Sequence, residues 1–186
     1  MKNIALMWKK WKKTRKFLKI KSAFGYPCTI AAGPFAKMKY SFESHGSSIV
    51  PKLVGSYEAP LESWIEEAIK NGYNRIIDIG CAEGYYAVGL AFREASPIIY
   101  AFYTSENALN MLLANIALNT LKSKIEIGKI CDADALQKIA GEGSLVICDI
   151  EGAEVELLDP INISALLRTD MIIETHDCLR AGITDL

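Results

Sequence analysis

The sequence predicts an α/β fold in which a mostly parallel sheet is covered by helices on both faces. Two observations predict this class. Between residues 76 and 173, short apolar runs of strand length alternate with segments whose apolar residues recur at helical spacing. The runs are apolar at successive positions, which is typical of parallel strands that are buried on both faces.

Length and composition indicate one domain with a sizeable core, since 51% of the 186 residues are hydrophobic. The charge is uneven: residues 2–21 contain nine basic residues and no acidic one, whereas the remaining chain carries 12 basic and 22 acidic residues. This acidic remainder argues against a nucleic-acid partner. The five cysteines form no C-x-x-C pair and no apolar run reaches about 18 residues, so we expect reduced thiols, no membrane-spanning helix and a cytoplasmic protein.

Residues 1–21 are predicted to form a basic amphipathic helix. Its apolar stripe, with lysines opposite, consists of Ile4, Met7, Trp8, Trp11 and Leu18. Two interpretations stay open. The helix could dock peripherally on an anionic membrane surface or on a partner. Alternatively, it could pack its tryptophans onto its own domain or onto a second copy in a homo-oligomer.

Residues 22–57 are predicted to be a lead-in of short strands and turns, because glycine and proline recur between short apolar or aromatic runs. A hairpin is expected around residues 38–42. A helix then begins at Pro60 and runs through Ile69, and Asn71 with Gly72 provides its stop signal.

Strands and helices alternate after residue 72. The first strand, residues 76–79, leads through a glycine-punctuated turn into a helix that begins near Tyr85 and ends near Arg93. The other strands are expected at residues 98–102, 125–130, 145–148 and 171–173. Further helices are expected at residues 106–118, 135–140, 153–158 and 164–168, with Thr104 or Ser105 as the N-cap of the first of them.

Polar side chains lie at or just after the carboxyl ends of four predicted strands. They are Asp78 at the end of the first strand, Asp132 and Asp134 after the third, Asp149 with Glu151 after the fourth, and Glu174 with His176 after the fifth. In an open parallel sheet a ligand binds outside the carboxyl ends of the strands. The sequence therefore predicts an enzyme site at this edge, although helix capping is the alternative for some of these residues, above all Asp134.

The turn after the first strand reads Asp78-x-Gly80-x-Ala82-x-Gly84. It lacks the G-x-G-x-x-G fingerprint of dinucleotide-binding proteins. It resembles the first motif of class I S-adenosylmethionine-dependent methyltransferases, with Ala82 in place of the middle glycine. Because Gly80 and Gly84 have no Cβ atom, a ligand could approach the backbone closely. A larger residue at position 80 is expected to exclude the ligand and to leave the fold largely intact.

Further segments resemble the FkbM-type branch of these methyltransferases, over residues 55–177. They are Tyr100-Ala-Phe102, Asn115-Ile-Ala-Leu-Asn119, Asp149-Ile-Glu151-Gly152-Ala-Glu154 and Ile173-Glu174-Thr-His176. The third segment is the most distinctive. The resemblance implies a seven-stranded Rossmann-like sheet and methyl transfer from S-adenosylmethionine, commonly to a hydroxyl group. The implied acceptor is a small molecule or a sugar.

The resemblance also implies roles for individual residues. The residues that would line the methionine part of the cofactor are Asp78, Gly80, Cys81 and Gly84. Asp132 and Ala133 would contact its adenine. Asp149 would lie near the methionine amine or the acceptor. Glu58, with Tyr57 before it, would approach the cofactor, although a carboxylate that the helix dipole favours is an equal interpretation.

One position departs from the family pattern. The second strand of that family usually ends in an acid that accepts both ribose hydroxyls, and Tyr103 stands at this position. A phenol cannot chelate a diol as a carboxylate does. We therefore expect Tyr103 to bind the cofactor more weakly than an acid would, unless Glu106 takes over the role.

His176 is the candidate catalytic base, because a base must take the acceptor proton during methyl transfer. A structural histidine is the alternative. A divalent metal could instead be bound by Asp149, Glu174, His176 and Asp177. Their spacing does not favour that alternative, so no metal is predicted.

The chain ends soon after its fifth predicted strand. The residues from 178 to 186 are too few for two more strands, so residues 171–173 should form an apolar edge. We expect a Rossmann-like methyltransferase domain over residues 58–186 that is a C-terminally truncated fragment. Two alternatives stay open: a cofactor-binding domain without activity, and a membrane- or partner-docking protein that uses the Rossmann-like core as a scaffold.

Overall fold

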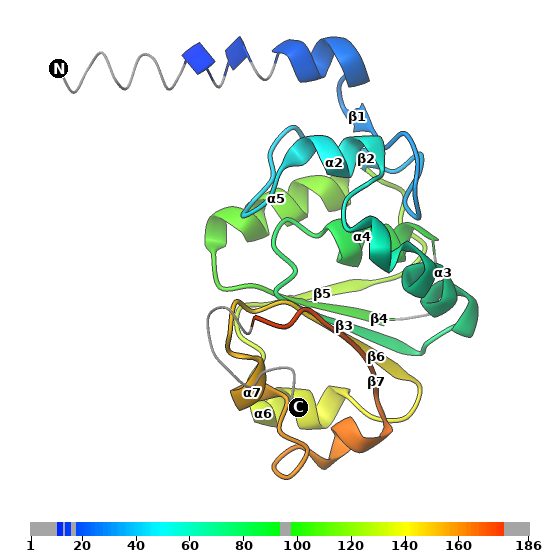
Figure 1. Ribbon diagram of the computed structural model, residues 1–186, viewed down its shortest axis with the longest axis vertical. Coiled ribbons are helices and arrows are strands. Elements are labelled where there is room, and N and C mark those ends of the chain that lie inside the picture. The colour runs from blue at the N-terminus through cyan, green and yellow to red at the C-terminus, as the bar shows by residue number, and fades with distance from the viewer. Residues whose placement is uncertain (1–10, 13, 16–17, 94–97, 177–186) are drawn as a thin grey trace, which may run out of the picture.

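The computed structural model describes residues 11–12, 14–15, 18–93 and 98–176 (Figure 1). Its centre is a five-stranded sheet in the order β5-β4-β3-β6-β7, and every neighbouring pair is parallel. The strands are β3 (Arg75–Ile79), β4 (Ile98–Phe102), β5 (Ile125–Gly128), β6 (Ser144–Cys148) and β7 (Asp170–Ile173). The predicted parallel sheet is therefore confirmed.

Helices cover both faces of this sheet, as predicted. On one face lie α3 (Glu62–Asn71), α4 (Tyr85–Arg93) and α5 (Glu106–Ala117), and on the other lie α6 (Ala133–Ile139), α7 (Glu154–Leu157) and the 3₁₀ helix η2 (Ser164–Arg168) (Figure 1). Successive strand residues alternate between two hydrophobic clusters. Ile76 and Leu145 belong to the cluster that includes α4 residues, whereas Ile77 and Val146 belong to the cluster that includes α6 residues. This alternation explains why the strands are apolar at successive positions.

The order of the strands reverses next to β3. The chain first adds β4 and β5 on one side of β3, and it then returns to add β6 and β7 on the other side. In open α/β sheets such a reversal creates a crevice outside the carboxyl ends of the central strands. The fold therefore provides a ligand crevice between the ends of β3 and β6.

The lead-in segment packs on the α4 side of the sheet. It contains β1 (Cys28–Thr29), paired antiparallel with β2 (Lys39–Tyr40), and then helix α2 (Ile49–Val54). The 3₁₀ helix η1 (Ala59–Leu61) follows it. Phe35, Met38 and Leu53 are fully buried in the same cluster as the sheet residues. Gly89 in α4 makes room for Phe35, because a Cβ atom at Gly89 would lie 2.5 Å from the phenylalanine ring.

Helix α2 corrects the predicted run of strands and turns in this segment. Pro51, a turn signal in the sequence, lies in the first turn of the helix, where its missing N–H needs no partner. Gly55, with a φ angle of 85°, ends the helix, and its amide donates to the Pro51 carbonyl at 3.0 Å. Proline and glycine here mark the two ends of a short helix.

The ends of the chain are described only in part. Within the described ranges, β7 pairs with β6 alone and Met171 is 42% exposed, as predicted for an apolar edge. Trp11 and Leu18 are about half exposed, whereas Ile20 joins the core. Trp8 and the other stripe residues before residue 11 lie outside the described part, so the membrane and partner interpretations stay predictions. Helices in the described part are all too short or too polar to cross a bilayer.

Candidate functional site

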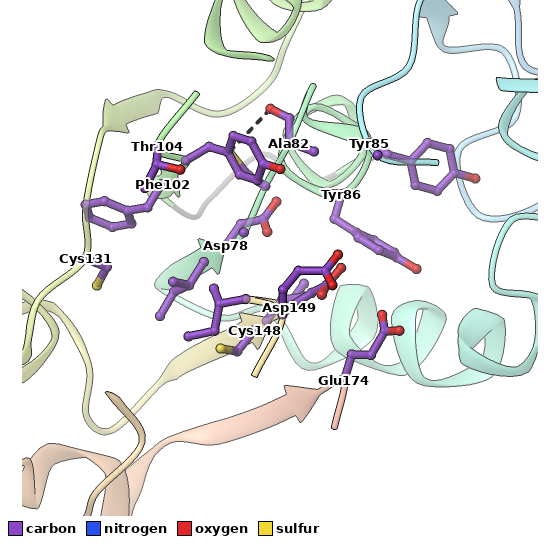
Figure 2. Close-up of a pocket in the computed structure, with 18 of the residues that line it drawn as sticks. Asp78, Ala82, Tyr85, Tyr86, Phe102, Thr104, Cys131, Cys148, Asp149 and Glu174 are labelled. Carbon is purple, nitrogen blue, oxygen red and sulfur yellow. Dashed lines mark hydrogen bonds between the residues drawn. The ribbon is translucent and has the colours of Figure 1, made fainter. Parts of the chain in front are cut away.

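A cavity of about 730 Å³ opens at the carboxyl ends of the central strands. Figure 2 shows Asp78, Asp149 and Glu174 at the ends of three neighbouring strands, with Tyr85 and Tyr86 on the side of α4. Residues of the lead-in segment and of the loop after β5 complete the wall. The cavity therefore lies at the edge of the sheet where the polar strand ends predicted a ligand site.

Most of the predicted site residues lie on the wall of this cavity. They are Glu58, Asp78, Gly80, Cys81, Tyr103, Asp149 and His176. Gly84, Asp132 and Ala133 are not among the lining residues. Asp132 instead caps helix α6, and its Oδ1 atom accepts a hydrogen bond from the Ala135 amide at 2.8 Å. Contact of Asp132 or Ala133 with an adenine stays a prediction, although Cys131, just before them, does line the cavity.

The turn after β3 is shaped by the close approach of β6. Gly80 has a φ angle of 94°, and a Cβ atom there would lie 1.7 Å from the carbonyl oxygen of Asp149. A larger residue at position 80 would therefore collide with the neighbouring backbone, and the expectation that it would leave the fold largely intact is wrong. Ala82 has a φ angle of 46°, in the left-handed region that favours glycine. It holds this conformation at the position where the resembling motif usually has a glycine.

Asp78 brings a buried carboxylate to the cavity. It is 3% exposed, and its Oδ2 atom has no hydrogen-bond partner. Burial raises the pKa of this carboxyl to about 7, and a backbone hydrogen bond from Ala87 opposes the rise only in part. Because a buried acceptor without a partner is unfavourable, the site suits a ligand that brings a donor or a positive charge.

A second polar group surrounds His176 at the ends of β6 and β7. The Nδ1 atom of His176 lies 2.8 Å from Oε1 of Glu154, whose side chain is fully buried. An ionised carboxylate only accepts hydrogen bonds, so Nδ1 is the donor and Nε2 is left facing Asp149, whose Oδ1 atom is 3.6 Å away. Burial lowers the pKa of this imidazole, but the hydrogen bond and charge of Glu154 outweigh it, and the net pKa is raised. Burial and then Glu174 raise the pKa of Asp149 to about 6.

Glu58 directly precedes the 3₁₀ helix η1 and lines the cavity. It has a φ angle of 48° and makes no capping hydrogen bond through its side chain. Its carboxylate instead accepts a hydrogen bond from the Tyr86 hydroxyl. Burial and then Glu58 raise the pKa of Tyr86 far above its ordinary value, so the hydroxyl stays protonated and donates. This arrangement favours the ligand-facing interpretation of Glu58 over the helix-dipole interpretation.

Tyr103 follows β4 and lines the cavity. Its ring meets the ring of His45 edge-on, with 5.3 Å between the ring centres. Glu106, the suggested substitute for the missing ribose acid, is 78% exposed and pairs with Lys129 at 2.8 Å. It is not among the residues that line the cavity. Glu106 therefore does not lie where it could contact a ligand in this cavity.

A buried ion pair beside the cavity was not predicted from the sequence. Glu83, in the turn after β3, is fully buried, and its Oε1 atom lies 2.6 Å from Nζ of Lys52 in α2. The hydroxyls of Tyr40 and Ser44 and the amide of His45 donate to the same carboxylate. Glu83 thereby anchors the lead-in segment to the turn that forms the floor of the site. The signal in the sequence is a charged residue within a turn of otherwise small residues.

No protein-family model matches the chain, and no curated protein matches its sequence. Among solved structures, a putative O-methyltransferase from Klebsiella pneumoniae is similar with a TM-score of 0.50 and 12% identity, over 73% of this chain and 60% of that chain. A precorrin 8W decarboxylase from Methanobacterium thermoautotrophicum gives a TM-score of 0.47 and 20% identity, over 70% of this chain and 64% of that chain. A putative RNA methyltransferase from Pyrococcus horikoshii gives a TM-score of 0.47 and 16% identity, over 77% of this chain and 74% of that chain.

This chain thus spans 60% and 64% of the length of the first two proteins, less than two thirds of each. At such low identity the likeness concerns the fold alone. The predicted fold class is confirmed: the chain has a Rossmann-like α/β methyltransferase fold with a five-stranded parallel sheet.

Proposed function

We propose that this chain is an FkbM-type methyltransferase domain that transfers a methyl group from S-adenosylmethionine to a hydroxyl group of a small molecule or sugar. The observation that carries the proposal is the cavity at the reversal between β3 and β6. The turn with the methyltransferase-like motif and carboxylates from three strands line this one cavity. Since a fold alone hosts many functions, the proposal rests on these residues and not on the sheet.

The residues on the wall fit the chemistry of the cofactor. A cavity of about 730 Å³ is within the range that binds small molecules and cofactors. The unpartnered Oδ2 atom of Asp78 is an acceptor for the ammonium group of the methionine part. Ile79, Phe102, Ile130 and Cys131 offer an apolar wall for the adenosine part. Bound here, the cofactor would supply the methyl group on a sulfonium centre.

His176 is the proposed base for the acceptor hydroxyl. When the ring is neutral and Nδ1 donates to Glu154, Nε2 carries the lone pair and faces Asp149, another residue on the wall of the cavity. Tyr57, Tyr86 and Glu174 line the same cavity and would position the acceptor. Positioning alone can supply much of the acceleration when the reaction needs only an in-line approach.

Replacing Ile130 with aspartate should weaken the binding of S-adenosylhomocysteine about tenfold, measured by isothermal titration calorimetry. Ile130 lines the cavity but is 69% exposed, so its replacement removes apolar wall without emptying the core. Ile161→Asp is the matched control, because Ile161 is 91% exposed and does not line the cavity. Absence of any heat of binding with the unaltered chain, or equal affinity in both variants, would contradict the proposed cofactor site.

Replacing Tyr103 with glutamate should tighten the binding of S-adenosylhomocysteine by about 1 kcal/mol, because a carboxylate makes charge-assisted hydrogen bonds to a diol. Tyr103 lines the cavity at the end of β4. Tyr103→Phe is the control, since it keeps the ring beside His45 and removes only the hydroxyl. If the glutamate variant binds no more tightly than the phenylalanine variant, the ribose does not lie at this position.

A further inference from the structure

Three carboxylates converge on one ring nitrogen at the end of β6. The Nε2 atom of His176 lies 3.6 Å from Oδ1 of Asp149, 4.0 Å from Oε2 of Glu151 and 3.8 Å from Oε1 of Glu174. One ligand atom from each of His176, Asp149 and Glu151 can be chosen so that all lie within 4.8 Å of one another. All four residues line the cavity.

A buried residue behind the ring fixes its orientation. Glu154 has no exposed side-chain surface, and it holds Nδ1 of His176 at 2.8 Å. Its position is itself fixed, because the amides of Ile150 and Gly152 donate to the same oxygen. A carboxylate that accepts from the second nitrogen of an imidazole is the usual support of a metal-ligating histidine, since it fixes the tautomer and aims the other nitrogen at the ion.

Neutral His176 brings no donor to the centre of the cluster. When the ring carries its single proton on Nδ1, the lone pair of Nε2 faces the oxygens of Asp149, Glu151 and Glu174, which are acceptors as well. Oδ1 of Asp149, the oxygen that lies 3.6 Å from Nε2, is buried and has no hydrogen-bond partner. The lysines among the described lining residues, Lys52 and Lys129, are paired elsewhere. A positive charge at the centre of the cluster would therefore satisfy atoms that the described chain leaves unsatisfied.

We infer that Asp149, Glu151, Glu174 and His176 bind a divalent transition-metal cation at the wall of the cavity. Carboxylate oxygens combined with one imidazole nitrogen suit ions such as Mn²⁺, whereas an all-oxygen set would suit Mg²⁺ or Ca²⁺ better. Ligand atoms bound to one ion lie about 3 Å apart, so small rotations of the exposed Glu151 and Glu174 side chains would close the set. The turn at Glu151, with a φ angle of 58°, returns the chain so that Glu151 comes to lie beside Asp149.

A bound cation would change the role of His176. It would occupy the Nε2 lone pair, so His176 could not serve as the base while the ion is present. The ion would instead act as a Lewis acid on an oxygen of a molecule in the cavity. The inference goes beyond the proposed methyl transfer and does not depend on it, since metal binding can be measured without cofactor or acceptor.

The test is a titration of the metal-free full chain with Mn²⁺, followed by the loss of the electron paramagnetic resonance signal of free Mn²⁺. We expect one Mn²⁺ site per chain, and a pulsed spectrum that shows coupling of the ion to an imidazole nitrogen. Glu151→Gln should weaken binding at least tenfold. Because Glu151 is 79% exposed, this variant should fold normally. His176→Ala should remove the nitrogen coupling.

The matched control is Glu142→Gln, since Glu142 is an exposed acid at the opposite end of β6. It should bind Mn²⁺ as the unaltered chain does. The inference is overturned if the unaltered chain leaves the free Mn²⁺ signal unchanged, if Glu151→Gln binds as tightly as Glu142→Gln, or if no nitrogen coupling is seen. None of these results would bear on the binding of S-adenosylhomocysteine, which is measured separately.

Discussion

Replacing Glu83 with glutamine should lower the free energy of unfolding by about 3–5 kcal/mol, because it leaves the charge of Lys52 buried without an opposite charge. The two side chains are 0% and 3% exposed, and Nζ lies 2.6 Å from Oε1. Glutamine keeps the shape and one acceptor for the hydroxyls of Tyr40 and Ser44, but its NH2 group would face the donating amide of His45, so the expected loss combines the missing charge with one lost hydrogen bond. Equilibrium unfolding in urea, followed by tryptophan fluorescence, measures it.

Two further variants make this result specific. The double variant Lys52→Met with Glu83→Gln should recover most of the lost stability, because no unpaired charge is then buried. Glu106→Gln removes one partner of the exposed pair with Lys129 and should leave the unfolding free energy unchanged within error. A Glu83→Gln variant as stable as the unaltered chain would show that Lys52 reaches solvent and that the pair does not hold the lead-in segment.

The fold could be predicted because its signals are local. Four of the five strands are mainly apolar runs, and the helices repeat apolar residues along one face, so windows of about ten residues are enough to predict most elements. The parallel order alone places Asp78, Asp149 and Glu174 at one edge of the sheet. Helix α2 was missed because Pro51 and Gly55 signal turns as readily as they signal helix ends.

The contacts that shape the site could not be predicted, because they join distant segments. Lys52 and Glu83 are 31 positions apart, and neither shows a pattern that points to the other. The sequence suggests that Gly80 leaves room for a ligand, yet the Asp149 carbonyl, at the end of the neighbouring strand β6, lies against it. A motif shows which residue types are present. Only the packing of β3 beside β6 shows why the residue at position 80 must be as small as glycine.

Asp78→Asn should change how stability depends on pH, and the effect is as large as that of the buried ion pair. Burial raises the folded-state pKa of Asp78 from 3.8 to about 7; Asp149 and Glu58 add to the rise, and Lys52 opposes it. Between these two values unfolding releases a proton, so the free energy of unfolding falls as pH rises from about 4 to about 7 and then levels off. A shift of about 3 pKa units corresponds to about 4 kcal/mol.

The asparagine variant lacks this proton, so its stability relative to the unaltered chain should rise by up to about 4 kcal/mol between pH 4 and pH 8. Any constant effect of the amide on packing cancels in that difference, which urea unfolding at each pH in EDTA can measure. The same variant should bind S-adenosylhomocysteine more weakly, because the acceptor for the ammonium group is lost. If the asparagine variant is both more stable at high pH and weaker in binding S-adenosylhomocysteine, the buried carboxylate of Asp78 destabilises the fold and serves to bind the ligand. Parallel pH curves for the two proteins would instead show that Asp78 ionises as easily in the folded chain as in the unfolded one, and the argument for a ligand at its Oδ2 atom would fail.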